Sequence, residues 1–192
     1  GEVVALNAAT GQRLWEQELP LNEPEQAALG GGLAVSGNVV FATSADGQVF
    51  ALTATTGQII WQVGLGVPLR AAPTVLGEQL FIVSHDNRLF ALSALNGALI
   101  WTHSGMPEAL SLISAASPAA GFGLTLVPYS SGELFALRAS DGRFVWSDTL
   151  ASPFSGQDPA STLTALAAAP VVADGLVYAM GLNGGLSAYV LA

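Results

Sequence analysis

The chain has 192 residues, of which 51% are hydrophobic, and its formal net charge is −9. This composition allows a substantial core and excludes an intrinsically disordered chain. The absence of cysteine excludes disulfides, thiolate metal sites and cysteine nucleophiles, and the five cationic side chains are too scattered for a nucleic-acid-binding surface.

One pattern recurs from the first residues onward: four apolar residues, a turn that carries glycine, and a second apolar run that ends in tryptophan. The tryptophans are Trp15, Trp61, Trp101 and Trp146, which lie 46, 40 and 45 residues apart, and the turn glycines are Gly11, Gly57, Gly97 and Gly142. A truncated copy at 184–189 lacks the tryptophan. This period predicts four-stranded propeller blades. Repeated helix pairs are the weaker alternative, because the segments show no helical spacing.

In chain order, we expect one propeller segment over residues 1–192. Its blades are predicted at 1–18, 31–64, 72–103, 115–148 and 169–192. The first blade supplies only its last two strands, and the last supplies three, at 171–173, 176–180 and 186–190. The fold class is therefore all-β, a partial propeller of four-stranded antiparallel blades with three full and two incomplete blades.

The repeated residues are expected to have structural roles. Runs of four apolar residues predict strands that are covered on both faces by neighbouring sheets. Pro73, Pro118 and Pro170 stand at the start of the first strand of their blades, where the missing N–H suits an innermost edge strand. The turn glycines are interpreted as permitting the positive φ of a tight hairpin. The tryptophans are interpreted as packing between blades, with ligand stacking as the alternative.

The pattern Ala-Leu-x-Ala-x-x-Gly-x-x-x-Trp, which runs from Ala5 to Trp15 and returns three times, resembles the repeat of pyrroloquinoline-quinone-type (PQQ-type) propellers. The segment at 108–118 is similar to the BamB family of outer-membrane protein assembly lipoproteins. The resemblance implies an eight-bladed propeller, of which about half is present here. It also implies a periplasmic location at the outer membrane through a lipid anchor outside this chain, and scaffolding of the POTRA domains of BamA.

The resemblance further implies that Leu110, Leu112 and Ile113 contact this partner, although Ile113 stands where the family often has arginine. A second, acidic contact patch of the family falls on Ala165 and Ala167, so its carboxylates are missing. Exposed leucines in a connection between blades would themselves mark a binding surface. The alternative is that Leu110 and Leu112 fold back onto the blade edges.

Two other function classes remain open. A quinoprotein dehydrogenase would need oxygen ligands for calcium and an aspartate base, whereas the acidic residues here fall mostly in turns. His85 and His103 are expected at the surface, and no serine-nucleophile motif is present. We therefore expect no catalysis, cofactor or metal. A ligand-binding or sensor propeller is the third class. The open end blades predict association with a second copy, strand swapping, or pairing with the missing half.

Overall fold

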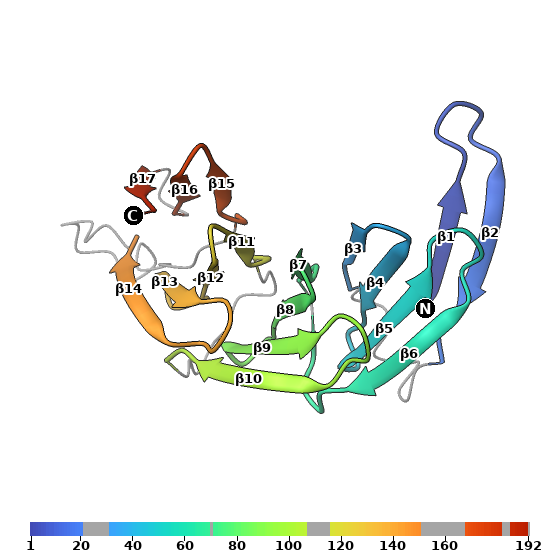
Figure 1. The fold of residues 1–192 in the computed structure, drawn as a ribbon, viewed down its shortest axis with the longest axis horizontal. Coiled ribbons are helices and arrows are strands. Elements are labelled where there is room, and N and C mark those ends of the chain that lie inside the picture. Colours follow the sequence, from blue (N-terminus) through green and yellow to red (C-terminus); the bar gives the residue numbers. More distant parts are fainter. Residues whose placement is uncertain (21–30, 70, 107–115, 151–167, 182–184, 192) are drawn as a thin grey trace, which may run out of the picture.

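The computed structural model describes residues 1–20, 31–69, 71–106, 116–150, 168–181 and 185–191. Regular structure in these residues is β throughout, and five antiparallel sheets follow one another along an arc (Figure 1). Within these ranges no helix is long and apolar enough to span a bilayer. The predicted all-β class with four-stranded antiparallel blades is confirmed.

The strands occur in each sheet in chain order. The first sheet contains β1 (Glu2–Leu6) and β2 (Arg13–Glu18). The second contains β3 (Leu33–Ser36), β4 (Val39–Thr43), β5 (Gln48–Thr53) and β6 (Ile59–Gly64). The third contains β7 (Thr74–Leu76), β8 (Gln79–Val83), β9 (Arg88–Ser93) and β10 (Leu99–Ser104). The fourth contains β11 (Ala119–Gly121), β12 (Leu124–Pro128), β13 (Glu133–Arg138) and β14 (Phe144–Thr149). The fifth contains β15 (Val171–Ala173), β16 (Leu176–Met180) and β17 (Leu186–Val190).

The first strands of successive sheets line the inside of the arc. Contacts join β3 to β7, β7 to β11 and β11 to β15, while β6, β10 and β14 run along the outside (Figure 1). Pro73, Pro118 and Pro170 directly precede β7, β11 and β15, within one residue of the predicted position at the start of the first strand. A proline just outside the strand removes no hydrogen bond from the ladder.

The core consists of layers between neighbouring sheets. Val49, Phe50, Ala51 and Leu52 of β5 are all fully buried, because both faces of their sheet are covered. Val49 and Ala51 pack toward the third sheet, and Phe50 and Leu52 pack toward the first. The same alternation recurs in β9 and β13, which explains why these strands carry consecutive apolar residues rather than an alternating pattern.

A tryptophan on the outer strand of one sheet rests on the glycine turn of the next. A Cβ atom on Gly57 would stand 2.5 Å from the Trp15 ring, and the indole Nε1 of Trp15 donates to the Ala54 carbonyl at 2.8 Å. Trp61 makes the same pair of contacts with Gly97 and Ala94, and Trp101 makes it with Gly142 and Ala139. The turn glycines have φ between 69° and 73°, and each turn adjoins a shift in strand register.

Candidate functional site

The connections between sheets begin beside one set of hairpins. The amides of Leu65, Gly105 and Leu150, each just after an outer strand, donate to the carbonyls of Gly47, Asn87 and Gly132 at 2.8–3.0 Å. These acceptors belong to the hairpins between the second and third strands. We call this side the connection face, made of hairpins 44–47, 84–87 and 129–132 and the connection starts at 65, 105 and 150. The partner contacts predicted from the sequence belong to one of these connections.

The predicted partner residues lie in the connection between the third and fourth sheets. Leu110, Leu112 and Ile113 lie outside the described residues, as do Ala165 and Ala167. The structure does define the flanks of this connection. Met106 at its start is 65% exposed, and Ala116 at its end is buried. The site is therefore built below from the residues that hold these flanks.

Asn87 holds the start of this connection against two sheets. Its side-chain Nδ2 donates to the Met106 carbonyl at 3.0 Å, and its Oδ1 accepts from the Ser130 amide at 3.1 Å and the Ser130 hydroxyl at 2.9 Å. Asn87 is 3% exposed and has a φ of 58°. Asparagine tolerates this left-handed conformation better than most side chains. Asn87 therefore both forms the turn and joins Met106 to Ser130 through its side-chain hydrogen bonds.

Tyr129 supports the same flank from the fourth sheet. The Tyr129 ring is fully buried. A Cβ atom on Gly105 would stand 2.6 Å from this ring, so only glycine allows the backbone at residue 105 to pack directly on it. The Tyr129 hydroxyl lies 2.7 Å from Nδ1 of His103, and the ring of Phe135 packs against both. The connection therefore leaves β10 over a packed aromatic cluster.

The protonation states of this pair follow from their surroundings. Burial lowers the pKa of His103, and the charge of Glu133 offsets only part of this effect. Burial and then the charge of Glu133 raise the pKa of Tyr129 well above its usual value. At neutral pH Tyr129 therefore keeps its hydroxyl proton, His103 is neutral, and the two side chains share one hydrogen bond. His103 was expected at the surface, and the structure shows it half-buried, because its ring packs against Tyr129 and Phe135 of the fourth sheet.

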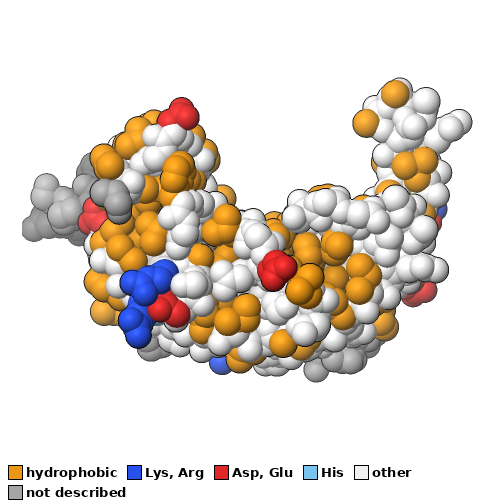
Figure 2. Space-filling view, in the orientation of Figure 1, with side chains coloured by type: hydrophobic (Ala, Val, Ile, Leu, Met, Phe, Trp, Pro, Cys, Tyr) orange, Lys and Arg blue, Asp and Glu red, His pale blue; other side chains and the backbone are white. Residues whose placement is uncertain are grey.

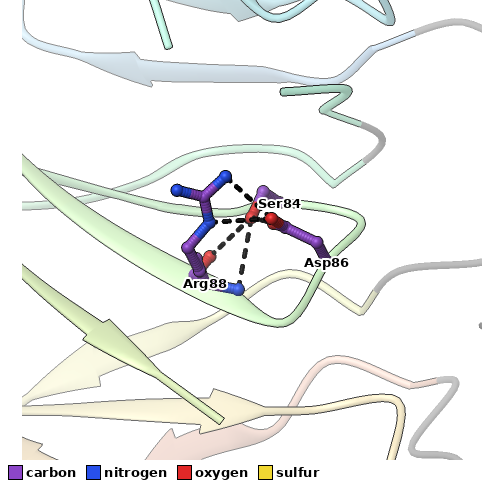
Figure 3. A network of polar contacts seen from close by, with 3 residues as sticks. All are labelled: Ser84, Asp86 and Arg88. Atoms are coloured by element: carbon purple, nitrogen blue, oxygen red, sulfur yellow. Dashed lines mark hydrogen bonds and ion pairs between the residues drawn. The ribbon is translucent and has the colours of Figure 1, made fainter. Parts of the chain in front are cut away.

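Ser84, Asp86 and Arg88 form a polar network on the hairpin that carries Asn87 (Figure 3). The Ser84 hydroxyl donates to Asp86 Oδ1 at 2.5 Å, and Arg88 Nε donates to Asp86 Oδ2 at 2.8 Å. Burial alone would raise the pKa of Asp86, but the hydrogen bonds from Arg88 and Ser84 and the Arg88 charge outweigh it and lower the pKa. The network therefore stabilises the turn in which Asn87 stands.

The described residues offer little for cofactor or acid–base chemistry. Among them, no group of three or more His, Asp or Glu side chains is placed to hold a metal ion. The polar side chains near the Met106 flank bind one another or the backbone. This arrangement can position a connection for binding, whereas general acid–base catalysis needs a titratable group that reaches a substrate.

Sequence analysis missed the roles of Asn87 and Tyr129. Both were visible as departures from the repeat, because Asn87 stands where the other hairpins have Gly47 and Gly132, and Tyr129 stands where they have Ser44 and Ser84. Such departures within a regular repeat indicate positions where a contact specific to one blade replaces the repeated one.

Comparison with known proteins identifies the family. Residues 1–192 match the family model described as outer membrane protein assembly factor BamB. The chain belongs to the BamB family. The resemblance inferred from the repeat is thus confirmed. BamB of Escherichia coli K12 is 40% identical over 192 residues, which are 98% of this chain and 49% of that protein. The chain spans about half the length of the curated BamB relatives that it matches.

Solved structures agree on the fold. The crystal structure of BamB from Moraxella catarrhalis has a TM-score of 0.81 and 21% identity over all of this chain and 63% of that chain. The quinohemoprotein alcohol dehydrogenase ADHIIG of Pseudomonas putida has a TM-score of 0.67 and 16% identity over 93% of this chain and 34% of its own. At these identities the likeness shows a shared propeller fold alone, so a dehydrogenase activity does not follow from it.

Proposed function

We propose that the chain is part of a non-catalytic scaffold for outer-membrane protein assembly. A match to the BamB family over residues 1–192 carries this proposal, because the curated relatives bear the name of outer membrane protein assembly factors. The corresponding location is the periplasmic side of the outer membrane, with a lipid anchor in the full-length protein.

The proposed partner surface is the connection between the third and fourth sheets, which binds the POTRA region of BamA through Leu110, Leu112 and Ile113. Support comes from its described flank. Asn87 fixes the Met106 carbonyl to the Ser130 hairpin, and Tyr129 packs beneath Gly105. A flank that is already ordered reduces the conformational entropy lost when the connection binds a partner.

A pull-down of the BamA POTRA region by the 192-residue chain tests this proposal. The double variant Leu110→Glu, Leu112→Glu should retain less of the POTRA region, because it places charges in an apolar contact. The matched control is Leu95→Glu, at a leucine that is 66% exposed in the turn between β9 and β10, away from the connection face. Equal retention by the double variant and the control would remove the site assignment.

The dehydrogenase alternative predicts different properties. A quinoprotein would bind a coloured quinone with calcium and reduce a dye when alcohol is added. The scaffold proposal predicts a colourless protein whose POTRA binding is unchanged by a calcium chelator. Chromophore content and dye reduction therefore separate the two functions without reference to the binding site.

A further inference from the structure

The outer strand of the third sheet, β10, has a free edge between two neighbouring four-stranded sheets. β10 pairs with β9 on one side, and none of the described strands pairs with its other edge. The second and fourth sheets, which lie on either side, both have their outer strands, β6 and β14 (Figure 1). The free edge of β10 is therefore a feature of the middle of the arc.

The register of β10 shows which of its backbone groups point outward. The Gly105 amide, just after the strand, donates to the Asn87 carbonyl at 2.8 Å. Hydrogen-bonded and non-hydrogen-bonded pairs alternate along an antiparallel ladder. The backbone groups of His103 therefore face β9, and those of Thr102 and Ser104 face away from it. The N–H and C=O groups of Thr102 and Ser104 thus form a row at the free edge that can pair with one further strand.

The edge of β10 lacks most of the features that discourage pairing with another chain. Natural sheets protect exposed edges with lysine, proline, charged side chains or bulges. β10 reads Leu-Ile-Trp-Thr-His-Ser, without lysine, proline or a carboxylate, and its bulge at Ile100 leaves Trp101–Ser104 regular. By contrast, Asp148 places a charge on β14, and the Gln62 side chain of β6 reaches the Pro20 carbonyl. Among the outer strands β6, β10 and β14, β10 is therefore the least protected.

Apolar side chains are exposed on both faces beside this edge. Leu99 is 58% exposed, and it pairs with Leu92, which packs toward the second sheet. On the side of the fourth sheet, Phe144 is 60% exposed, and its ring packs on Phe135, which in turn packs on His103 of β10. Figure 2 shows hydrophobic side chains along the convex side of the arc. A strand added to the edge can therefore place apolar side chains on either face.

We propose that the free edge of β10 binds an extended strand of an unfolded outer-membrane β-barrel protein. The inference rests on the proposed function, because an assembly scaffold would hold such chains before they fold. Strands of these barrels carry apolar side chains at every second position, and these side chains face lipid only after insertion. Thr102 and Ser104 pair with the backbone of the strand, and Leu99 or Phe144 covers its apolar face.

The size of the edge favours an unfolded strand over a folded partner. Its regular part is Trp101–Ser104, a short contact that suits a chain held briefly and then released. A stable interface between folded proteins buries about 1,200–2,000 Å². Backbone groups are the same in every strand, so one edge can bind strands of different sequence. Because β10 ends two residues before Met106, the bound strand lies beside the flank of the proposed POTRA contact.

A proline at position 102 tests the backbone pairing. Because the Thr102 amide faces away from β9, Thr102→Pro removes a donor from the free edge without removing a hydrogen bond from the sheet. Thr102→Ala keeps this donor and is the matched control. The probe is a fluorescent synthetic peptide of about ten residues with apolar side chains at every second position. A second peptide has the same composition with its apolar residues grouped together.

Fluorescence anisotropy should show equal binding of the alternating peptide by the native chain and Thr102→Ala, and binding about tenfold or more weaker by Thr102→Pro. Equal binding by the two variants, or equal binding of the two peptides by the native chain, would overturn the proposal. Loss of POTRA retention or of self-association in Thr102→Pro would assign the edge to that partner or to a second copy, and would also overturn it. Failure of the native chain to retain the POTRA region counts against the proposed function, which the peptide does not measure.

Disulfide capture locates the bound strand even if the proline variant does not fold. The chain has no cysteine, and directly opposed residues in antiparallel strands have Cα atoms about 4.5–5.5 Å apart, within disulfide range. Under mild oxidation, Thr102→Cys should capture an alternating peptide that carries one central cysteine. Leu95→Cys, at an exposed leucine in the turn before β10, should capture much less of it. Equal capture at the two positions would contradict binding at the edge of β10.

Discussion

The ring of Trp15 lies 2.5 Å from the point where a Cβ atom on Gly57 would stand, and this contact joins the first sheet to the second. The close approach explains why glycine is needed there for more than its backbone conformation. A side chain would have to displace an indole that is also fixed by its hydrogen bond to the Ala54 carbonyl.

Gly57→Ala should therefore destabilise the protein by about 2–4 kcal/mol, from strain at positive φ together with a clash against Trp15. Gly37→Ala is the control, since it has a φ of 57° and nothing within 4 Å, and it should cost about 1–2 kcal/mol. Denaturant unfolding of both variants measures the difference. Equal midpoints would mean that the tryptophan contact adds nothing to the glycine requirement.

The side-chain hydrogen bonds of Asn87 predict an order of stability among variants at this position. Asn87→Gly keeps the positive φ but loses the bonds to Met106 and Ser130, which should cost about 1–3 kcal/mol. Asn87→Ala loses the same bonds and adds backbone strain of about 1–2 kcal/mol. Chemical unfolding should thus rank native above Asn87→Gly above Asn87→Ala. If the glycine variant matched the native protein, the side chain would not hold the connection.

The hydrogen-bonded pair of half-buried His103 and buried Tyr129 predicts a pH dependence of stability. Because the folded protein lowers the pKa of His103, the unfolded chain binds a proton more readily. Stability should be complete above the usual histidine pKa of about 6.5 and should fall as the pH drops below it. Unfolding midpoints between pH 5 and 8 would show this slope.

His103→Gln should flatten that slope, and His85→Gln, which leaves the pair intact, should keep it. Asp86 affects stability in a different pH range. Because the folded protein lowers the pKa of Asp86, its contribution to stability is lost only as the pH falls below the usual aspartate pKa of 3.8. A slope between pH 5 and 7 that survived in His103→Gln would assign it to another group.

The repeat made the fold predictable because equivalent strands have the same apolar pattern and the same packing in successive blades. The four apolar residues at 49–52 needed cover on both faces, and only neighbouring sheets supply it. The positions of β15, β16 and β17 agree with those predicted from the sequence. In the second sheet, β5 extends one residue past this apolar run, to Thr53, because its hydrogen bonding continues beyond the apolar residues.

The candidate site was less predictable, because its described residues depart from the repeat. Asn87 and Tyr129 gain their roles from contacts across two sheets, and their departures from the repeat mark the two positions without specifying these contacts. The partial burial of His103 was not predicted, because its partner Tyr129 lies 26 residues away in the sequence. The apolar residues Leu110, Leu112 and Ile113 remain predictions from the family resemblance.

Cross-linking from the connection tests the central claim most directly. A photoreactive residue placed at Leu112 of the 192-residue chain should capture the BamA POTRA region, and the same residue at Leu95 should not. The scaffold account predicts a cross-linked product from position 112 that diminishes when Asn87→Gly is added, since the flank is then no longer held. A product from position 95 alone, or from neither position, would contradict it.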